Sequence, residues 1–284
     1  MKIKTLAAIA LTLLTFSSCR FGTAIKMISE KAQEEMRANH DYEHKVEEWG
    51  EVIDVEIDSV MPFTGIQTNG NIYIVFTQDS VFSIRMHGNK KAVEEYHYWW
   101  SESTMVFNTK DGYTYDTTKD DVNIDNNTPA ITIYVTAPEL TDIMVYGASD
   151  IKINDGLKQD WALNLHINGA GNIDMEHADL GGMLTINISG AGNIDLDDIT
   201  CADNALMHIQ GAGNIEVDNI KCKDIDTEVN GAGNIDLNVD CDNLKADING
   251  VGNIDLKGVC NTLDSNFGGT MGNIDTDELK VRKK

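Results

Sequence analysis

A six-residue motif, Gly-Ala-Gly-Asn-Ile-Asp, recurs through the second half of the chain and constrains the fold more than any other feature. Successive copies begin about 19–22 residues apart, and divergent copies lie at Gly147–Ile151 and Gly269–Asp275. A period of about 20 residues that is kept from Gly147 to Asp275 is typical of a solenoid, in which each unit is stabilised by its neighbours. The close copies are Gly169–Asp174, Gly190–Asp195, Gly211–Glu216, Gly231–Asp236 and Gly250–Asp255.

Apolar and polar residues alternate on both sides of each motif. Leu184, Ile186 and Ile188 precede one copy, and Ile194 and Leu196 follow it. Strict alternation predicts strands with one buried face, and the units are too short to hold a helix as well. We therefore predict an all-β fold, a single-stranded right-handed parallel β-helix (β-solenoid) with coils of about 19–22 residues. A signal peptide and a short helical linker are expected to precede it.

The two glycines of each motif are predicted to form a corner of the coil. Glycine has no Cβ, so it can adopt positive φ and can let the backbone of one coil approach the next closely. The predicted structural corners are Gly169, Gly171, Gly190, Gly192, Gly211, Gly213, Gly231, Gly233, Gly250 and Gly252.

The period also predicts two files of polar side chains along the axis. The Asn of each motif should hydrogen-bond to the Asn of the next coil, as in the Asn ladders of stacked sheets. The acidic residue should point outward, where neighbouring carboxylates raise one another's pKa. Calcium could relieve this repulsion, but the spacing differs from the nonapeptide calcium repeats. A solvated acidic face is therefore the favoured interpretation, with no metal and no cofactor. The Asn file is Asn172, Asn193, Asn214, Asn234, Asn253 and Asn273; the weak calcium candidates are Asp174, Asp195, Glu216, Asp236 and Asp255.

Four cysteines occur once per coil at matching places, Cys201, Cys222, Cys241 and Cys260, where an earlier coil has Leu180. A stack of buried thiols is the favoured interpretation, because cysteine packs as a small hydrophobe. Disulfides between neighbouring coils are the alternative. No two of these cysteines have the Cys-x-x-Cys spacing that is typical of zinc sites.

The first residues have the pattern of an export signal. Lys2 and Lys4 precede the apolar run Leu6–Phe16, and Ser17-Ser18-Cys19 follows. This ending resembles a bacterial lipobox, which implies that residues 1–18 are a lipoprotein signal peptide and that Cys19 carries a lipid anchor in the membrane. Residues 19–50 are polar and rich in helix formers, which favours a helical tether over the alternative of a cap on the first coil.

The β-helix is expected to span residues 51–284, with irregular coils and insertions at 51–146 and regular coils at 147–277. Period-two runs predict strands at Val52–Ile57, Asn71–Phe76, Val81–Met86 and Ala130–Val135. Residues 89–95 could form one helical turn, and the polar segment 108–129 is the longest predicted insertion.

The densest aromatic cluster lies in this irregular part, at Tyr96, Tyr98, Trp99 and Trp100. Such a cluster could stack sugars or anchor a partner. Alternatively, alternate rings pack inside the coil, because alternation turns every second side chain inward. The structural interpretation is favoured, and the four residues remain the candidate binding site.

Several segments resemble one known family. They are the Gly-Ala-Gly-Asn-Ile-Asp repeats, Ile66–Gln78, Ile133–Leu140 and Val145–Ile151, and the likeness covers about residues 52–277. The chain resembles the GIN-domain (DUF2807-type) family, described as "putative auto-transporter adhesin" head domains. This resemblance implies a right-handed β-helix on a lipoprotein of Bacteroidota-type bacteria, in the outer membrane at its periplasmic face or on the cell surface.

The formal net charge of −24 argues against binding to nucleic acid or to anionic lipid. The favoured function is a non-catalytic, lipid-anchored adhesin or scaffold for a glycan or protein ligand. A polysaccharide-active lyase or glycosidase and a purely structural envelope protein are the alternatives. No catalytic residue is predicted, because the acidic file is periodic rather than convergent. The oligomeric state stays open, since an uncapped last coil around Asn273–Val281 would favour end-to-end pairing and the basic tail Lys280–Lys284 would oppose it.

Overall fold

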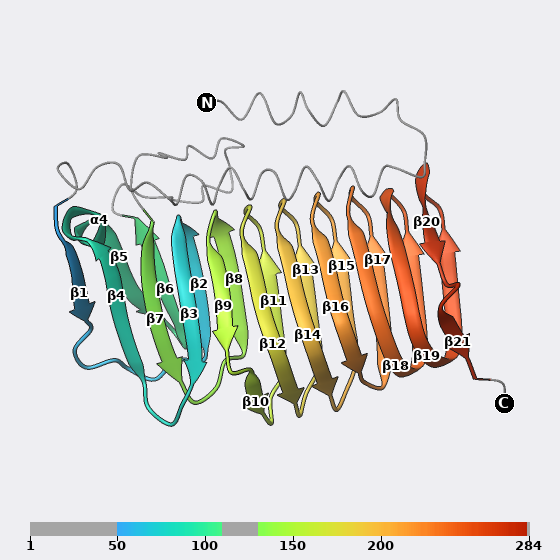
Figure 1. Cartoon of the computed structure of the whole chain (residues 1–284), viewed down its shortest axis with the longest axis horizontal. Helices are drawn as coiled ribbons and strands as arrows, with labels where there is room; N and C mark the ends of the chain where they lie inside the picture. Colours follow the sequence, from blue (N-terminus) through green and yellow to red (C-terminus); the bar gives the residue numbers. More distant parts are fainter. Residues whose placement is uncertain (1–49, 110–129, 283–284) are drawn as a thin grey trace.

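The computed structural model describes residues 50–109 and 130–282. The predicted signal peptide, Cys19, almost all of the tether and most of the insertion at 108–129 lie outside the described residues. The described chain is a parallel β-solenoid of about seven turns. In Figure 1 the chain rises behind, descends in front and advances from left to right, which makes the turns right-handed, as predicted.

Two walls of parallel strands face each other across the core. We call the wall formed by strands that precede the motif glycines wall A, and the wall formed by strands that follow them wall B. Wall A contains β2 (Gly65–Gly70), β8 (Asp142–Gly147), β11 (Leu163–Ile167), β13 (Leu184–Ile188), β15 (Ala205–Ile209), β17 (Asp224–Val229) and the second halves of β18 (Asn234–Ile248) and β19 (Val251–Phe267). Wall B contains β3 (Ile72–Gln78), β9 (Asp150–Asn154), β12 (Asn172–Leu180), β14 (Asn193–Cys201), β16 (Asn214–Lys221), the first halves of β18 and β19, and β20 (Met271–Asp275). Two short strands complete the pairing: β10 (Leu157–Gln159) pairs with the end of β12, and β21 (Leu279–Val281) pairs with Gly258–Cys260 in the middle of β19.

Equivalent residues of successive coils lie opposite each other, as the period predicts. Ile173 pairs with Ile194 in wall B, and Leu184 pairs with Ala205 in wall A. The inward residues of both walls are almost completely buried. One continuous apolar core therefore runs along the axis and stabilises each coil through its neighbours.

The motif glycines form corners because of space rather than backbone angle. A Cβ on Gly192 would lie well inside contact distance of the Gly171 carbonyl oxygen and 2.7 Å from Ile167 Cγ2. The predicted close approach of coils is confirmed. The predicted use of positive φ is wrong for the ten corner glycines, whereas Gly147 and Gly272 of the divergent copies do have positive φ.

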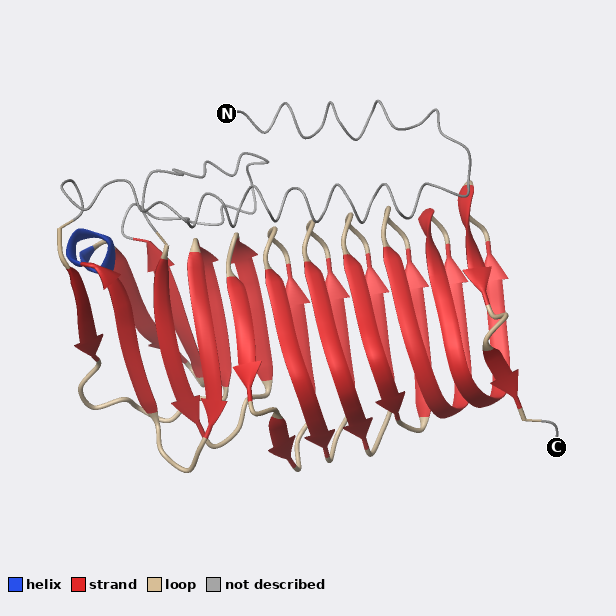
Figure 2. Ribbon diagram, in the orientation of Figure 1, coloured by secondary structure: helices blue, strands red, loops and turns tan. Residues whose placement is uncertain are grey.

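The first strands depart from the parallel pattern. In wall B, β1 (Val52–Glu56) is antiparallel to β4 (Ser83–Asn89), and β4 is antiparallel to β7 (Ile131–Ala137), which pairs with β3. In wall A, β5 (Tyr96–Ser101) and β6 (Thr104–Thr109) form a hairpin beside β2. The predicted helical turn is present as α4 (Lys90–Glu94). Figure 2 shows it as the blue element at one end of the solenoid. No helix in the described ranges is long and apolar enough to cross a membrane.

Candidate functional site

Three rings of the aromatic cluster face the core side of wall A. Tyr96 is buried, and its hydroxyl donates to the Asn71 carbonyl oxygen at 2.7 Å. Trp100 packs against the core, and its Nε1 donates to the Met61 carbonyl oxygen at 3.3 Å. Tyr98 lies between them and meets Trp100 edge to face, with ring centroids 6.1 Å apart. The predicted alternation of the rings is therefore present, and Tyr96 and Trp100 have structural contacts.

The remaining aromatic surface is exposed. Trp99 points away from the core, opposite Val106 of β6, and 43% of its surface is accessible. Tyr98 is 40% accessible although it faces the core side, because β5 is the outermost described strand of wall A. Met61 beside Trp100 is 51% accessible. We call Met61, Tyr98 and Trp99, which lie around both sides of this edge strand, the aromatic surface; the alternation did not identify Met61, which precedes the first strand of wall A.

A polar cluster that the sequence did not reveal lies on the outer face of wall B. Asp54 of β1 accepts from the Arg85 guanidinium and lies 3.2 Å from His87 Nδ1. The Arg85 guanidinium also lies 4.0 Å from the centre of the Tyr134 ring. The hydrogen bond from Arg85, followed by that from His87, lowers the pKa of Asp54. These groups are solvated, so we interpret the cluster as a surface ion pair that joins β1, β4 and β7.

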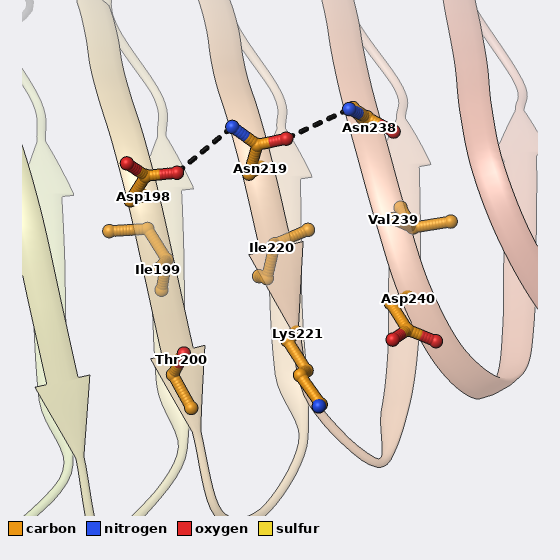
Figure 3. Close-up of a pocket in the computed structure, with 9 residues that line it drawn as sticks. All are labelled: Asp198, Ile199, Thr200, Asn219, Ile220, Lys221, Asn238, Val239 and Asp240. Atoms are coloured by element: carbon orange, nitrogen blue, oxygen red, sulfur yellow. Dashed lines mark hydrogen bonds between the residues drawn. The ribbon is translucent and has the colours of Figure 1, made fainter.

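A shallow groove of about 180 Å³ crosses the outer face of three successive coils (Figure 3). Asn238 Nδ2 donates to Asn219 Oδ1, and Asn219 Nδ2 donates to Asp198 Oδ1, each at 2.9 Å. The groove lies beside a shift in register between Val217 and Ile220. It is smaller than the pockets of roughly 300–1,000 Å³ that enclose small ligands. Its polar groups bond to one another along the axis, as structural ladders do.

The predicted Asn ladder is present from Asn172 to Asn253. Each Nδ2 donates to the Oδ1 of the preceding coil at distances between 2.8 and 3.2 Å. The ladder extends one coil further than predicted, because Asn172 donates to Asp150. Asn273 lies in register with Asn253 at the other end.

The acidic file also lies in register on the outer face of wall B. Burial, followed by repulsion from Glu216 and Asp174, raises the pKa of Asp195. Burial and repulsion from Asp236 raise the pKa of Asp255. The predicted direction is confirmed, although burial is the larger cause. In the ranges that the structure covers, no group of three His, Cys, Asp or Glu side chains has the arrangement of a metal site.

Replacement of Asp195 by Asn should stabilise the protein at pH 7. The pKa of Asp195 is higher in the folded state than its ordinary 3.8, so the folded state binds the proton more tightly. Its contribution to stability is fully present below about pH 3.8 and is lost as the pH rises through the folded pKa. Because the Asp195 side chain is still exposed and solvent screens its charge, the effect is small: we expect Asp195→Asn to raise the free energy of unfolding at pH 7 by about 0.5 kcal/mol and to leave it unchanged in acid. Urea titrations at several pH values would measure this, with Asp203→Asn in an exposed turn as the control; equal effects of both variants would contradict the prediction.

The cysteine file is present as predicted. Cys201 pairs with Leu180, Cys241 pairs with Cys260, and all four thiols are free. Cys222 is half-buried and the other three are buried. Burial raises the pKa of Cys241 to about 12. The hydrogen bond from Cys222 lowers the pKa of Cys201. The four thiols pack as core side chains of successive coils.

Comparison with known proteins agrees with the fold. The model of the family described as "Putative auto-transporter adhesin, head GIN domain" matches residues 62–239 and 198–283. A crystal structure of a "putative adhesin" from Bacteroides fragilis is 25% identical, with a TM-score of 0.66 over 80% of this chain and 97% of that one. A "putative adhesin" from Parabacteroides distasonis is 19% identical, with a TM-score of 0.63 over the same shares.

A protein from Parabacteroides distasonis described as a "putative lipid binding protein" is 16% identical and shares the fold, with a TM-score of 0.56 over 79% of this chain and 97% of that one. A search of curated protein sequences finds no match. The family match spans most of the solenoid, including both the irregular first coils and the regular repeats. The chain therefore belongs to the GIN-domain family of "putative auto-transporter adhesin" heads.

Proposed function

We propose that this protein is a non-catalytic, lipid-anchored β-solenoid of the outer membrane that binds a glycan or protein partner through the aromatic surface. The distribution of exposed apolar side chains carries this proposal. Among the described residues, seven of the ten large exposed apolar side chains lie between Val52 and Tyr134, and none lies between Trp161 and Phe267. The regular coils thus have a polar exterior, whereas the first coils expose rings and a methionine. Exposed apolar groups gathered in one region mark interaction sites.

Substitution of Trp99 tests this surface. We expect Trp99→Ala to weaken binding at least about tenfold, because a partly exposed ring that stacks on a ligand contributes about 2 kcal/mol. The full chain and its variants would be applied to glycan and protein arrays, and the affinity for each hit would be measured in solution. Trp161→Ala is the matched control, because Trp161 is 58% accessible but lies on a later coil. Loss of binding in the control alone, or turnover of an acidic polysaccharide, would contradict the proposal.

Lipidation at Cys19 is the second part of the proposal, and it rests on the lipobox-like ending Ser17-Ser18-Cys19. Cells that express the protein would be fed an alkyne-labelled fatty acid, and membranes would be separated from soluble protein. We expect the wild-type chain to be labelled and membrane-bound, and Cys19→Ala to lose both properties. Cys201→Ser should keep the label, since Cys201 lies in the core. Label retained by Cys19→Ala would exclude this anchor.

A further inference from the structure

The C-terminal end of the solenoid has a step, because wall B is one strand longer than wall A. The last strand of wall B, β20, pairs with Val251–Asp255 of β19. The last strand of wall A is the second half of β19, Thr262–Phe267, which pairs with Asn243–Ile248 of β18. No described strand lies on its other side.

Both last strands present backbone hydrogen-bonding groups at the step. The Gly268 N–H donates to the Ile248 carbonyl oxygen at 2.8 Å, toward β18. Because backbone groups of alternate residues point to the same side of a strand, those of Leu263 and Ser265 point to the open side. In wall B, the Asn234 N–H donates to the Gly213 carbonyl oxygen of the preceding coil. Asn273 occupies the same position two coils later, so its backbone groups also face the preceding coil. The backbone groups of its neighbours Gly272 and Ile274 therefore face the open side.

We propose that two copies of this chain pair end to end through these steps in a symmetric dimer. A two-fold axis parallel to the strands places wall B of one copy beyond wall A of the other. Strands of the two walls run in opposite directions, so β20 becomes antiparallel to Thr262–Phe267 of the partner subunit. Each projecting strand then fills the recess of the other copy, which is the self-complementary contact that two-fold symmetry requires.

The side chains favour one register of this pairing. Leu263 lies opposite Ile274 of the partner subunit, and both face the core. Asp264 lies opposite Asn273 of the partner subunit on the outer face, where the amide donates to the carboxylate. In the described chain no residue hydrogen-bonds to the Asn273 side chain, so this contact would supply a partner for its amide. A slip by two residues would instead place Asp264 opposite Asp275 of the partner subunit, and like charges directly opposite are destabilising.

At the opposite end of the solenoid, the edge of wall B is protected by charge, and the edge of wall A, β5, carries the aromatic surface proposed to bind another partner. The outermost strand of wall B there, β1, exposes Asp54 and Glu56 at its edge. Charged side chains on an edge strand oppose further pairing. The two C-terminal edge strands carry one carboxylate each, Asp264 and Asp275, and both face neutral residues in the proposed register. The paired residues 262–267 and 271–275 do not include the basic tail Lys280–Lys284. Phe267, 44% accessible on the wall A edge, lies opposite Thr270 of the partner subunit in this register.

A cysteine pair tests the register. Asp264 and Asn273 would form a non-hydrogen-bonded antiparallel pair, with Cα atoms about 4.5 Å apart, which suits a disulfide. Within one chain they lie on the outer faces of different walls, so an intrachain bond cannot form. We expect the full-length Asp264→Cys/Asn273→Cys variant to form a covalent dimer with oxidised glutathione, which is reduced to two thiols. Asp264→Cys alone should stay uncrosslinked, and Asn266→Cys/Asn273→Cys, offset by two residues, should crosslink far less.

Ser265→Pro tests the pairing without disulfides. The Ser265 N–H faces the open side, so proline removes an interface donor and leaves the bonds to β18 intact. Sedimentation of the processed chain in mild detergent, corrected for bound detergent and lipid, should give twice the mass of one chain. Ser265→Pro should give the single mass, keep the circular dichroism spectrum of the wild type, and lose any dependence of the melting temperature on protein concentration. A monomeric wild-type chain, a Ser265→Pro dimer, or equal crosslinking of the offset cysteine pair would overturn the proposal.

Discussion

Replacement of Gly192 by Val is expected to lower the free energy of unfolding by about 3 kcal/mol or more. A Cβ at this position would overlap the Gly171 carbonyl oxygen and lie 2.7 Å from Ile167 Cγ2. A backbone oxygen cannot rotate away as a side chain can, so two neighbouring coils must separate locally. The separation also weakens the hydrogen bond from the Asn193 N–H to that same oxygen, 3.2 Å long in the wild type. In a solenoid the loss is not confined to one coil, because each coil is stabilised by the next.

The matched control is the neighbouring residue of the same corner. Ala191 is exposed, so Ala191→Val adds its methyl groups toward solvent and should change stability by less than about 0.5 kcal/mol. For a domain of this size we expect the melting temperature of Gly192→Val to fall by about 10 °C and that of Ala191→Val to stay within about 2 °C. Thermal melts followed by circular dichroism would measure both. Similar midpoints for the two variants would show that the coils are not closely stacked at this corner.

The regular coils could be predicted from the sequence because the period sets the register. Once Ile173, Ile194 and Ile215 are aligned by the motif, the adjoining Asn and acidic residues must stack as well. The structure confirms both files. The period does not explain why the corners need glycine. A corner can require either a positive φ or space for the neighbouring backbone, and glycine satisfies both requirements. Only the structure shows that space is the reason here.

The strands of the first coils could be predicted from the sequence, but their order and direction within the two walls could not. Alternation identifies β1, β4 and β7, yet it does not say which strand lies beside which or in which direction. The cluster of Asp54, Arg85 and Tyr134 depends on the antiparallel order β1, β4, β7, so no local pattern could reveal it. In the candidate site, alternation predicted that every second ring faces inward but not which rings these are; the structure places Trp99 on the outer side. The exposure of Tyr98 arises from the place of β5 at the edge of wall A, which is a property of the topology.

Replacement of Gln159, a buried glutamine near the start of the regular coils, should have the second large effect on stability. Gln159 of β10 lies in register with Leu180, in the file that the cysteines continue, so a polar side chain occupies an apolar position. Its Nε2 donates to the carbonyl oxygens of Leu140 and Ala162 at 3.0 and 3.1 Å, and its Oε1 accepts from the Leu140 N–H at 3.0 Å. The side chain thus binds both backbone groups of Leu140, as a neighbouring strand would.

We expect Gln159→Ala to lower the free energy of unfolding by about 2–4 kcal/mol, because it leaves buried backbone groups of Leu140 without their partner. Gln159→Leu restores most of the volume but not the hydrogen bonds, so it should be almost as destabilising. Gln78 is the internal control. It also makes three hydrogen bonds to backbone, with Pro138 and Lys158, at 2.7 to 2.8 Å.

Gln78 is only half-buried, so water can replace its contacts, and we expect Gln78→Ala to cost about 1 kcal/mol. Urea unfolding of the three variants would measure the difference. If Gln159→Ala and Gln78→Ala proved equally destabilising, burial could not be the cause of the larger loss. If instead Gln159→Leu matched the wild type, packing would account for the effect and the hydrogen bonds to Leu140 would contribute little. The expected order, with both Gln159 variants well below Gln78→Ala, follows only if the unpaired backbone of Leu140 stays out of contact with water.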